Sequence, residues 1–283
     1  MAPLPGSMLR SAPMKLRRLF LSLGLLAGLI YLGGCALLYQ QQRALIYFPR
    51  PFVTAEGSGR LTLPGDEQTQ VRVTVWPGRG SGALLFFGGN ADDPHLSLPL
   101  LARTFPEYTL YLLHYRGYGE SGGTPSEAAL VGDALKLYDQ IQGQHARVVV
   151  LARSLGTGVA VQLAAARPVQ GLVLVTPYRS LVEEARSRYP YVPVDWLLQD
   201  RFESWRYAPR VQAPTLILGA AEDQVIAPAN AEALARDFAP ERVRYRLLPG
   251  VGHQSILDDP AYPQLLREAL AEQAAGEGRP GAP

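Results

Sequence analysis

A serine in the middle of the chain has the sequence context that a serine nucleophile requires. Ser154 follows the apolar run 148–152 and precedes the small-residue stretch 155–158. A strand, a tight turn centred on serine and a helix expose the hydroxyl and direct the next backbone N–H, that of Leu155, toward a reacting carbonyl. A serine that caps a helix after a strand is also common. The motif on its own therefore leaves a structural role and a catalytic role equally open.

A histidine near the C-terminus is the candidate general base for this serine. His253 follows the strand candidate 243–248 and the loop 249–252, whose two glycines free the backbone to turn the imidazole toward the centre of a sheet. The other three of the four histidines lack this context. We expect them on a helix surface, at a strand end and in a loop, in the order His95, His114 and His145.

The acid that orients His253 is expected after another apolar run. Asp223 follows the run 215–218 and precedes Pro228, which can start a helix. The chain order serine, acid, histidine, with each residue after a strand, is the order of a Ser-His-Asp triad built on a mostly parallel sheet. Glu222, next to Asp223, is the rival acid.

The loop after the apolar run 83–87 is the candidate for completing an oxyanion hole. It reads GGNAD from Gly88 to Asp92. We expect the backbone N–H of Asn90 to be its donor, acting beside the N–H of Leu155. An ordinary turn between a strand and a helix would contain the same glycines, so a purely structural role is the alternative.

The elements that must hold these residues alternate between strand-like and helix-like stretches from residue 43 onward. This alternation is typical of the α/β class, with a mostly parallel sheet covered by helices. The expected strands are Val71–Trp76, Ala83–Phe87, Thr109–His114, Arg147–Leu151, Leu172–Val175, Thr215–Leu218 and Val243–Leu248. The expected helices are Pro94–Arg103, Ser126–Gln142, Leu155–Arg167, Pro228–Phe238 and Tyr262–Gln273. The stretch 176–212, rich in Tyr, Trp, Arg and Pro, interrupts the alternation and is expected to form a short cap over the C-terminal edge of the sheet.

The run 115–126 (YRGYGESGGTPS) is close to a signature that follows the fourth strand in a known family. With the serine, aspartate and histidine named above, and with the run 200–202 (DRF), the chain resembles the small membrane-anchored α/β-hydrolases. These are related to the eukaryotic abhydrolase-domain depalmitoylases and their bacterial counterparts. The resemblance covers nearly all of residues 43–273 and implies the α/β-hydrolase fold. It also favours Asp223 over Glu222, because such sequences usually place the acid a few residues before an apolar-Pro helix start.

Three positions depart from the pattern of that family. Ala152 stands where the serine motif usually begins with Gly, and alanine is the least disruptive replacement. His114 stands where relatives usually have Asp. Gly88 stands where most relatives have His, so we expect that a contact bracing the loop is lost while the backbone donor remains.

The N-terminus predicts a membrane segment. Residues 1–18 form a basic region, and the apolar stretch 19–39 contains no charge and is long enough to span a bilayer. The excess of Lys and Arg before this stretch places the rest of the chain outside the cytoplasm, on the periplasmic side in a Gram-negative bacterium. Within the stretch, the run 32–35 (LGGC) resembles a lipobox. An acylated Cys35 left after signal cleavage is therefore the alternative to an uncleaved anchor.

Composition narrows the classes of function. The chain has 283 residues, a formal net charge of +2 and a single cysteine. No run of Lys and Arg lies outside the N-terminus, so nucleic acid is not expected as a partner. One cysteine excludes internal disulfides and Cys-ligated metal clusters in the monomer, and we expect neither metal nor cofactor. The oligomeric state is left open, and the Gly- and Pro-rich residues 274–283 are expected to be a disordered tail.

Together these features predict a serine hydrolase that cleaves esters or thioesters of lipid-like acyl groups. The membrane segment points to a lipid-like substrate, as do the aromatic residues of the expected cap, among them Tyr178, Tyr189, Tyr191 and Trp196. A peptidase of the same fold is one alternative, because a fold does not settle chemistry. A non-catalytic envelope protein that keeps the scaffold for binding is another, although a binding role would not require serine, aspartate and histidine together.

Overall fold

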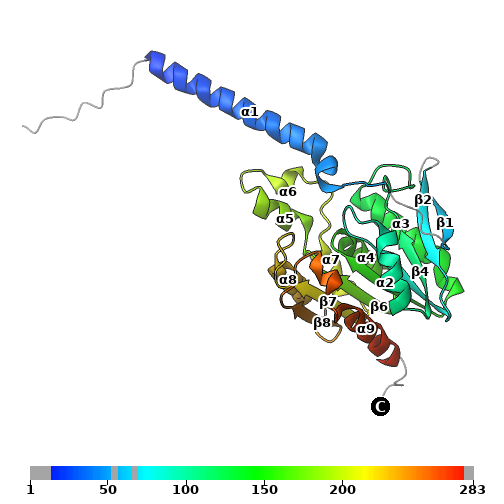
Figure 1. Cartoon of the computed structure of the whole chain (residues 1–283). Helices are drawn as coiled ribbons and strands as arrows, with labels where there is room; N and C mark the ends of the chain where they lie inside the picture. The colour runs from blue at the N-terminus through cyan, green and yellow to red at the C-terminus, as the bar shows by residue number, and fades with distance from the viewer. Residues whose placement is uncertain (1–13, 52–56, 66–68, 277–283) are drawn as a thin grey trace, which may run out of the picture. The chain divides into compact units, whose positions relative to one another are not determined.

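Two compact units make up the chain, Met1–Gln42 and Arg43–Pro283. The computed structural model, shown in Figure 1, describes residues 14–51, 57–65 and 69–276. Of the predicted basic region 1–18, residues 1–13 therefore lie outside the described residues.

The helix α1, Met14–Ile46, contains the apolar stretch predicted from the sequence and extends beyond it at both ends. Its 33 residues rise about 50 Å at 1.5 Å per residue, which exceeds the thickness of a bilayer core. By length and composition α1 can cross a membrane, and the same test is passed by a signal sequence near an N-terminus.

Among the described residues, eight strands form one sheet in the order β1-β2-β4-β3-β5-β6-β7-β8. Their bounds are β1 Gly59–Pro64, β2 Gln70–Trp76, β3 Gly82–Phe87, β4 Tyr108–Leu113, β5 Arg147–Arg153, β6 Gly171–Val175, β7 Thr215–Ala220 and β8 Val243–Leu248. β2 pairs antiparallel with β1 and with β4, and all other neighbours pair parallel. Because parallel strands end at the same edge of a sheet, side chains that follow β3, β5, β7 and β8 meet at that edge.

Helices cover both faces of this sheet (Figure 1). Their bounds are α2 Pro94–Thr104, α3 Glu127–Ile141, α4 Leu155–Ala166, α5 Leu181–Arg188, α6 Val194–Leu197, α7 Ser204–Tyr207, α8 Pro228–Asp237 and α9 Tyr262–Gly276. The apolar residues of α3, α4 and α8 belong to one core cluster, and those of α2 and α9 belong to a second. Alternate residues of β3 contribute to the two clusters, as expected for a strand buried on both faces. The predicted α/β-hydrolase fold, with its mostly parallel sheet, is confirmed.

Two expectations about the elements are wrong. β1 is a strand that the sequence does not predict, because it lies at the edge of the sheet and most of its residues are exposed, so it needs no continuous apolar run. Residues 274–276, predicted as tail, belong to α9, because the alanines at 274 and 275 favour helix. The rest of the predicted tail, 277–283, lies outside the described residues.

The stretch between β6 and β7 contains the helices α5, α6 and α7, where the sequence predicts a cap. Ser180 begins α5 by accepting a hydrogen bond from the N–H of Glu183 through its side chain. α5 and α6 contact each other and lie side by side in Figure 1. That this stretch covers a substrate stays a prediction.

Deleting residues 1–42 should leave a soluble, folded and active protein, because Arg43–Pro283 is a compact unit with both core clusters inside it. Circular dichroism, size-exclusion chromatography and an ester assay on the truncated protein test this. Aggregation together with loss of the thermal transition would contradict the two-unit division.

Candidate active site

Ser154 lies in a strained turn between β5 and α4. Its backbone has φ 48° and ψ −120°, a region that costs a non-glycine residue roughly 1–3 kcal/mol. Its N–H donates to the carbonyl of Val175 at 3.0 Å. Gly156 packs so tightly against the end of β3 that a Cβ there would clash with the carbonyl oxygens of Phe87 and Gly88. The surrounding backbone therefore fixes the strained turn and holds the hydroxyl at the edge of the sheet.

Three loops bring both Ser154 and Asp223 within hydrogen-bond distance of His253. His253 Nε2 lies 3.0 Å from Ser154 Oγ, and His253 Nδ1 lies 2.7 Å from Asp223 Oδ2. Asp223 and His253 are buried, whereas the rival acid Glu222 is exposed. The geometry places Asp223, and not Glu222, against the imidazole.

Asp223 is held in its charged form. Burial raises the pKa of its carboxyl group, but the hydrogen bond with His253 and those from the N–H groups of Ile226 and Val225 lower that pKa by more, so it lies below the ordinary value. Both N–H donors lie 2.8 Å from Oδ1. A carboxylate fixed in this way favours the imidazole tautomer with its proton on Nδ1, which leaves Nε2 free to accept the serine proton.

The loop 88–92, called the oxyanion loop below, lies against the start of α4. The N–H of Gly89 donates to Asp92 Oδ2 at 2.7 Å and is therefore committed inside the loop. The predicted donors are the N–H of Asn90, which comes next, and that of Leu155. Leu155 is the first residue of α4, where N–H groups have no acceptor within the helix. Both donors stay predictions.

The oxyanion loop is braced at Gly88, the position where most relatives have His. Tyr115 is buried and donates its hydroxyl hydrogen to the carbonyl of Gly88 at 2.8 Å. Burial raises the pKa of Tyr115 well above its ordinary value, so the hydroxyl keeps its proton. The hydrogen bond from Tyr115 therefore braces the oxyanion loop, although the histidine that relatives usually have at position 88 is absent.

Arg153, the residue before the serine, connects three parts of the site. Its side chain is 4% exposed and pairs with Asp92 of the oxyanion loop at 2.5 Å. Its Nη2 donates to the carbonyl of His253 at 3.2 Å and to Gln254 Oε1 at 2.6 Å. One buried guanidinium thus joins the oxyanion loop to the loop of the histidine. The sequence assigns it no role, although a charge at the end of a buried apolar strand is the signal that points to one.

The aromatic residues of the predicted cap do not form one set. Tyr178 is a core residue, 1% exposed, whose hydroxyl donates to the carbonyl of Leu155 at 3.1 Å. Its hydroxyl fits there because Gly158 has no side chain to fill the space. Tyr189 is 55% exposed, and Tyr191 and Trp196 are each 87% exposed. The expectation that Tyr178 belongs to a cap surface is therefore wrong.

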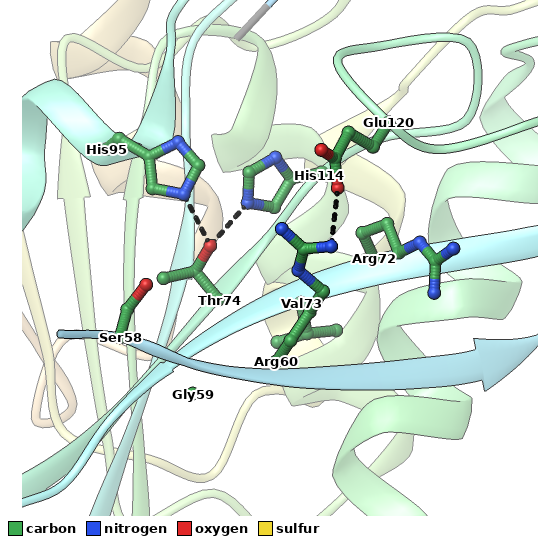
Figure 2. A pocket seen from close by; sticks show the side chains of 9 residues that line it. All are labelled: Ser58, Gly59, Arg60, Arg72, Val73, Thr74, His95, His114 and Glu120. Atoms are coloured by element: carbon green, nitrogen blue, oxygen red, sulfur yellow. Dashed lines mark hydrogen bonds and ion pairs between the residues drawn. The ribbon is translucent and has the colours of Figure 1, made fainter. Parts of the chain in front are cut away.

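A second group of polar side chains lines a pocket beside β2 (Figure 2). His95 Nε2 and His114 Nε2 both contact Thr74 Oγ1, at 2.8 and 2.7 Å, and Arg60 pairs with Glu120 at 3.2 Å. Thr74 lies inside β2 and pairs with both neighbouring strands, so the backbone around it is committed to the sheet and offers no oxyanion donors. The predicted surface position of His95 is wrong, because its ring packs toward Thr74 and is 11% exposed.

Metal-ligand residues do not gather at this edge of the sheet. In the part of the chain that the structure describes, no group of three or more His, Cys, Asp and Glu is placed to hold a metal ion.

Sequence comparison identifies relatives along most of the chain. The alpha/beta hydrolase family matches residues 73–277. An uncharacterized protein of Mycobacterium tuberculosis is 34% identical over 265 residues, which cover 88% of this chain and 94% of that protein. The lysophosphatidylserine lipase ABHD12 of Macaca fascicularis is 32% identical over 197 residues, which cover 58% of this chain and 49% of the lipase. The match to the lipase thus spans about half of its length.

Solved structures with a similar fold include enzymes that act on esters. A membrane phospholipase A, described as a bacterial virulence factor, superposes with a TM-score of 0.61 at 17% identity, over 92% of this chain and 98% of that chain. The esterase Pf2001 of Pyrococcus furiosus superposes with a TM-score of 0.63 at 13% identity, over 80% of this chain and 99% of that chain. At these identities the similarity shows the fold.

Replacing Arg153 by Met should lower kcat on an acyl ester about a hundred-fold, because both loops beside the serine lose a shared anchor and small displacements are costly. It should also lower the free energy of unfolding by about 1–3 kcal/mol, because Asp92 loses the hydrogen bond from its buried partner. The matched control is Arg167→Met, which breaks an exposed pair with Asp139 and should change stability by less than about 1 kcal/mol. Equal kinetics in the two variants would contradict the role of Arg153.

His114 should make stability depend on pH in acid. Burial, then the nearby charges of His95 and Arg60, lower its pKa from 6.5 to about 3. The unfolded chain therefore takes up a proton below pH 6.5 that the folded chain does not accept until about pH 3. In that window stability falls as pH falls, by up to about 1.4 kcal/mol per pH unit from this group. Urea unfolding at several pH values should show a shallower fall in His114→Gln, and parallel curves would contradict this assignment.

Proposed function

This chain belongs to the alpha/beta hydrolase family, and from that premise we propose that it is a serine hydrolase of ester or thioester bonds. Its abhydrolase-domain resemblance is confirmed by the family match and by the lipase relatives. The observation that carries the proposal is the chain of contacts from Ser154 Oγ through His253 to Asp223, at 3.0 and 2.7 Å. A serine in a strained turn at the end of a buried strand adds support.

In the proposed first half-reaction, Ser154 Oγ forms a bond to the acyl carbon while its proton passes to His253 Nε2. The electron pair of the carbonyl moves onto its oxygen, which the N–H groups of Leu155 and Asn90 stabilise. When the tetrahedral intermediate collapses, the bond to the alcohol or thiol breaks, and the leaving group takes the proton from Nε2. The acyl group is then covalently bound to the serine.

In the second half-reaction, water replaces the leaving group. His253 accepts a proton from water as the water oxygen bonds to the acyl carbon, and it returns that proton to Ser154 Oγ as the ester bond to the enzyme breaks. Asp223 keeps the imidazole in place and stabilises its charged form in both steps, without becoming protonated itself.

The proposed substrate is lipid-like. The relatives that support this are the lysophosphatidylserine lipases and, by fold, the membrane phospholipase A. A helix of membrane-spanning length and composition leads directly into the catalytic unit. An enzyme tethered in this way meets acyl lipids at high local concentration, which favours esters and thioesters of membrane lipids over peptides.

We place the catalytic unit outside the cytoplasm. Lys15, Arg17 and Arg18 precede the apolar part of α1, and Arg43 is the first basic residue after it, which is the asymmetry expected when the N-terminus faces the cytoplasm. Cys35 lies inside the continuous helix α1, and an acylated Cys35 stays the alternative to the uncleaved anchor. The intact mass of the mature protein separates the two.

Ser154→Ala, His253→Ala and Asp223→Asn should each remove most hydrolysis of a short-chain p-nitrophenyl ester while leaving the thermal transition in place. The expected loss in kcat is on the order of 10⁴-fold, with residual catalysis from the oxyanion hole. The double variant Ser154→Ala/His253→Ala should be scarcely slower than either single one, because the two residues act in one proton transfer.

The matched control is Glu222→Gln, which changes an exposed carboxylate next to Asp223 and should keep most activity. An inactive Glu222→Gln with an active Asp223→Asn would move the acid to Glu222. Full activity in Ser154→Ala would overturn the proposal, and an inactive wild type toward all acyl esters would favour the non-catalytic binding role.

A further inference from the structure

The segment 43–50, called the linker below, joins the apolar helix to the rest of the catalytic unit and makes specific contacts with it. Arg43 Nε donates to Asp200 Oδ2 at 3.0 Å, and the carboxylate of Asp200 is almost fully buried. Tyr47 is 2% exposed. The N–H of Gly119 donates to the carbonyl of Arg50 at 3.0 Å. The linker is thus bound to the catalytic unit at several points.

The centre of the linker is bonded to the side chain of Asn90 in the oxyanion loop. Asn90 Nδ2 donates to the carbonyl of Ile46 at 2.5 Å, and Asn90 Oδ1 accepts from the N–H of Phe48 at 3.0 Å. The hydroxyl of Tyr118 donates to the same Oδ1 at 2.6 Å and accepts from the same Phe48 N–H at 3.0 Å. One amide side chain, one phenol and two peptide groups of the linker form a closed network.

This network lies next to the backbone donor that the proposed mechanism uses. Ala91, the residue after Asn90, has φ 59°, a left-handed conformation that L-residues adopt at a cost of about 1 kcal/mol. Such a conformation persists only where neighbouring contacts hold it. On one side Asp92 is held by Arg153 and by the N–H of Gly89. On the other side the holding contacts are those between Asn90 and the linker.

Tyr118 is suited to a permanent role as donor in this network. It is 1% exposed, and its ring packs edge-on against that of Tyr115 with centroids 5.7 Å apart. Burial raises the pKa of its hydroxyl above the ordinary value, although the hydrogen bond from Phe48 lowers it in part. The hydroxyl therefore keeps its proton at neutral pH.

We propose that the linker is a positioning element of the active site, and that it sets the oxyanion loop through the side chain of Asn90. This inference rests on the proposed serine hydrolase function. It assigns the Asn90 side chain to loop positioning, distinct from the backbone N–H that is expected to bind the oxyanion. The linker, which follows the proposed membrane segment, is thus hydrogen-bonded to the oxyanion loop through the carbonyl of Ile46 and the N–H of Phe48.

The test uses two substitutions in the full-length chain, each with a matched control. Phe48→Pro removes the N–H that bonds Asn90 and Tyr118, and Phe48→Ala keeps that N–H while removing a side chain that is 52% exposed. Tyr118→Phe removes the shared hydroxyl, and Tyr138→Phe removes a hydroxyl bonded to the carbonyl of Pro168, a contact outside this network. Steady-state kinetics on a short-chain ester and the melting temperature are measured for all four.

We expect Phe48→Pro and Tyr118→Phe to lower kcat about ten- to a hundred-fold with little change in KM, because a misplaced oxyanion donor weakens binding of the transition state more than that of the substrate. Phe48→Ala and Tyr138→Phe should match wild type. A kcat for Tyr118→Phe within two-fold of that for Tyr138→Phe would overturn the inference. If proline at position 48 prevents folding, the comparison of Tyr118→Phe with Tyr138→Phe alone tests the proposed role of the linker.

Failure of the proposed linker role and failure of the proposed hydrolase function give different results. If wild type turns over esters no faster than Ser154→Ala, the proposed function fails and the linker has no oxyanion hole to position. If wild type is active and the two network variants are as fast as their controls, the proposed function stands and only the role of the linker is wrong.

Discussion

The backbone at Ser154 adopts a conformation that a serine avoids unless its surroundings leave no alternative. The carbonyl of Val175 fixes the N–H on one side, and the close approach of Gly156 to the end of β3 fixes the helix start on the other. Arg153, one residue earlier, ends a buried strand with a charge that must be paired, and the partners it finds lie in the oxyanion loop and the histidine loop. The strained turn at the serine and the pairing of this charge together fix the oxyanion loop and the histidine loop relative to Ser154.

Most of the sheet is predictable because its parallel strands are buried on both faces. Such strands must be almost continuously apolar, so runs like 148–152 and 172–175 stand out in the sequence. Ser154 and Asp223 each follow such a run, and His253 follows β8, which pairs parallel with β7. The three residues then meet at one edge, because parallel strands end together. Placement at the sheet edge is therefore a consequence of local patterns.

The rest of the site depends on contacts between residues far apart in the chain, which local patterns do not contain. Arg153 and Asp92 are 61 positions apart, and Asn90 and Ile46 are 44 apart. Tyr178 resembles a cap residue in the sequence because it follows β6 in an aromatic stretch. In the structure it is buried in the core, where its hydroxyl occupies the space that Gly158 leaves open. β1 could not be predicted, because an exposed edge strand does not need the apolar residues by which buried strands are recognised. In each case the deciding factor is which surface a side chain meets after folding.

We propose Ser154 as a nucleophile that its surroundings activate. Labelling the full-length protein with a fluorophosphonate, followed by digestion and peptide mapping by mass spectrometry, tests it directly, because such probes bond to a serine only where a base and an oxyanion hole act on it. We expect one phosphonyl adduct, on the peptide containing Ser154, that is absent in His253→Ala. An adduct on a different serine, or an unlabelled wild type under conditions in which a known serine esterase is labelled, would contradict it.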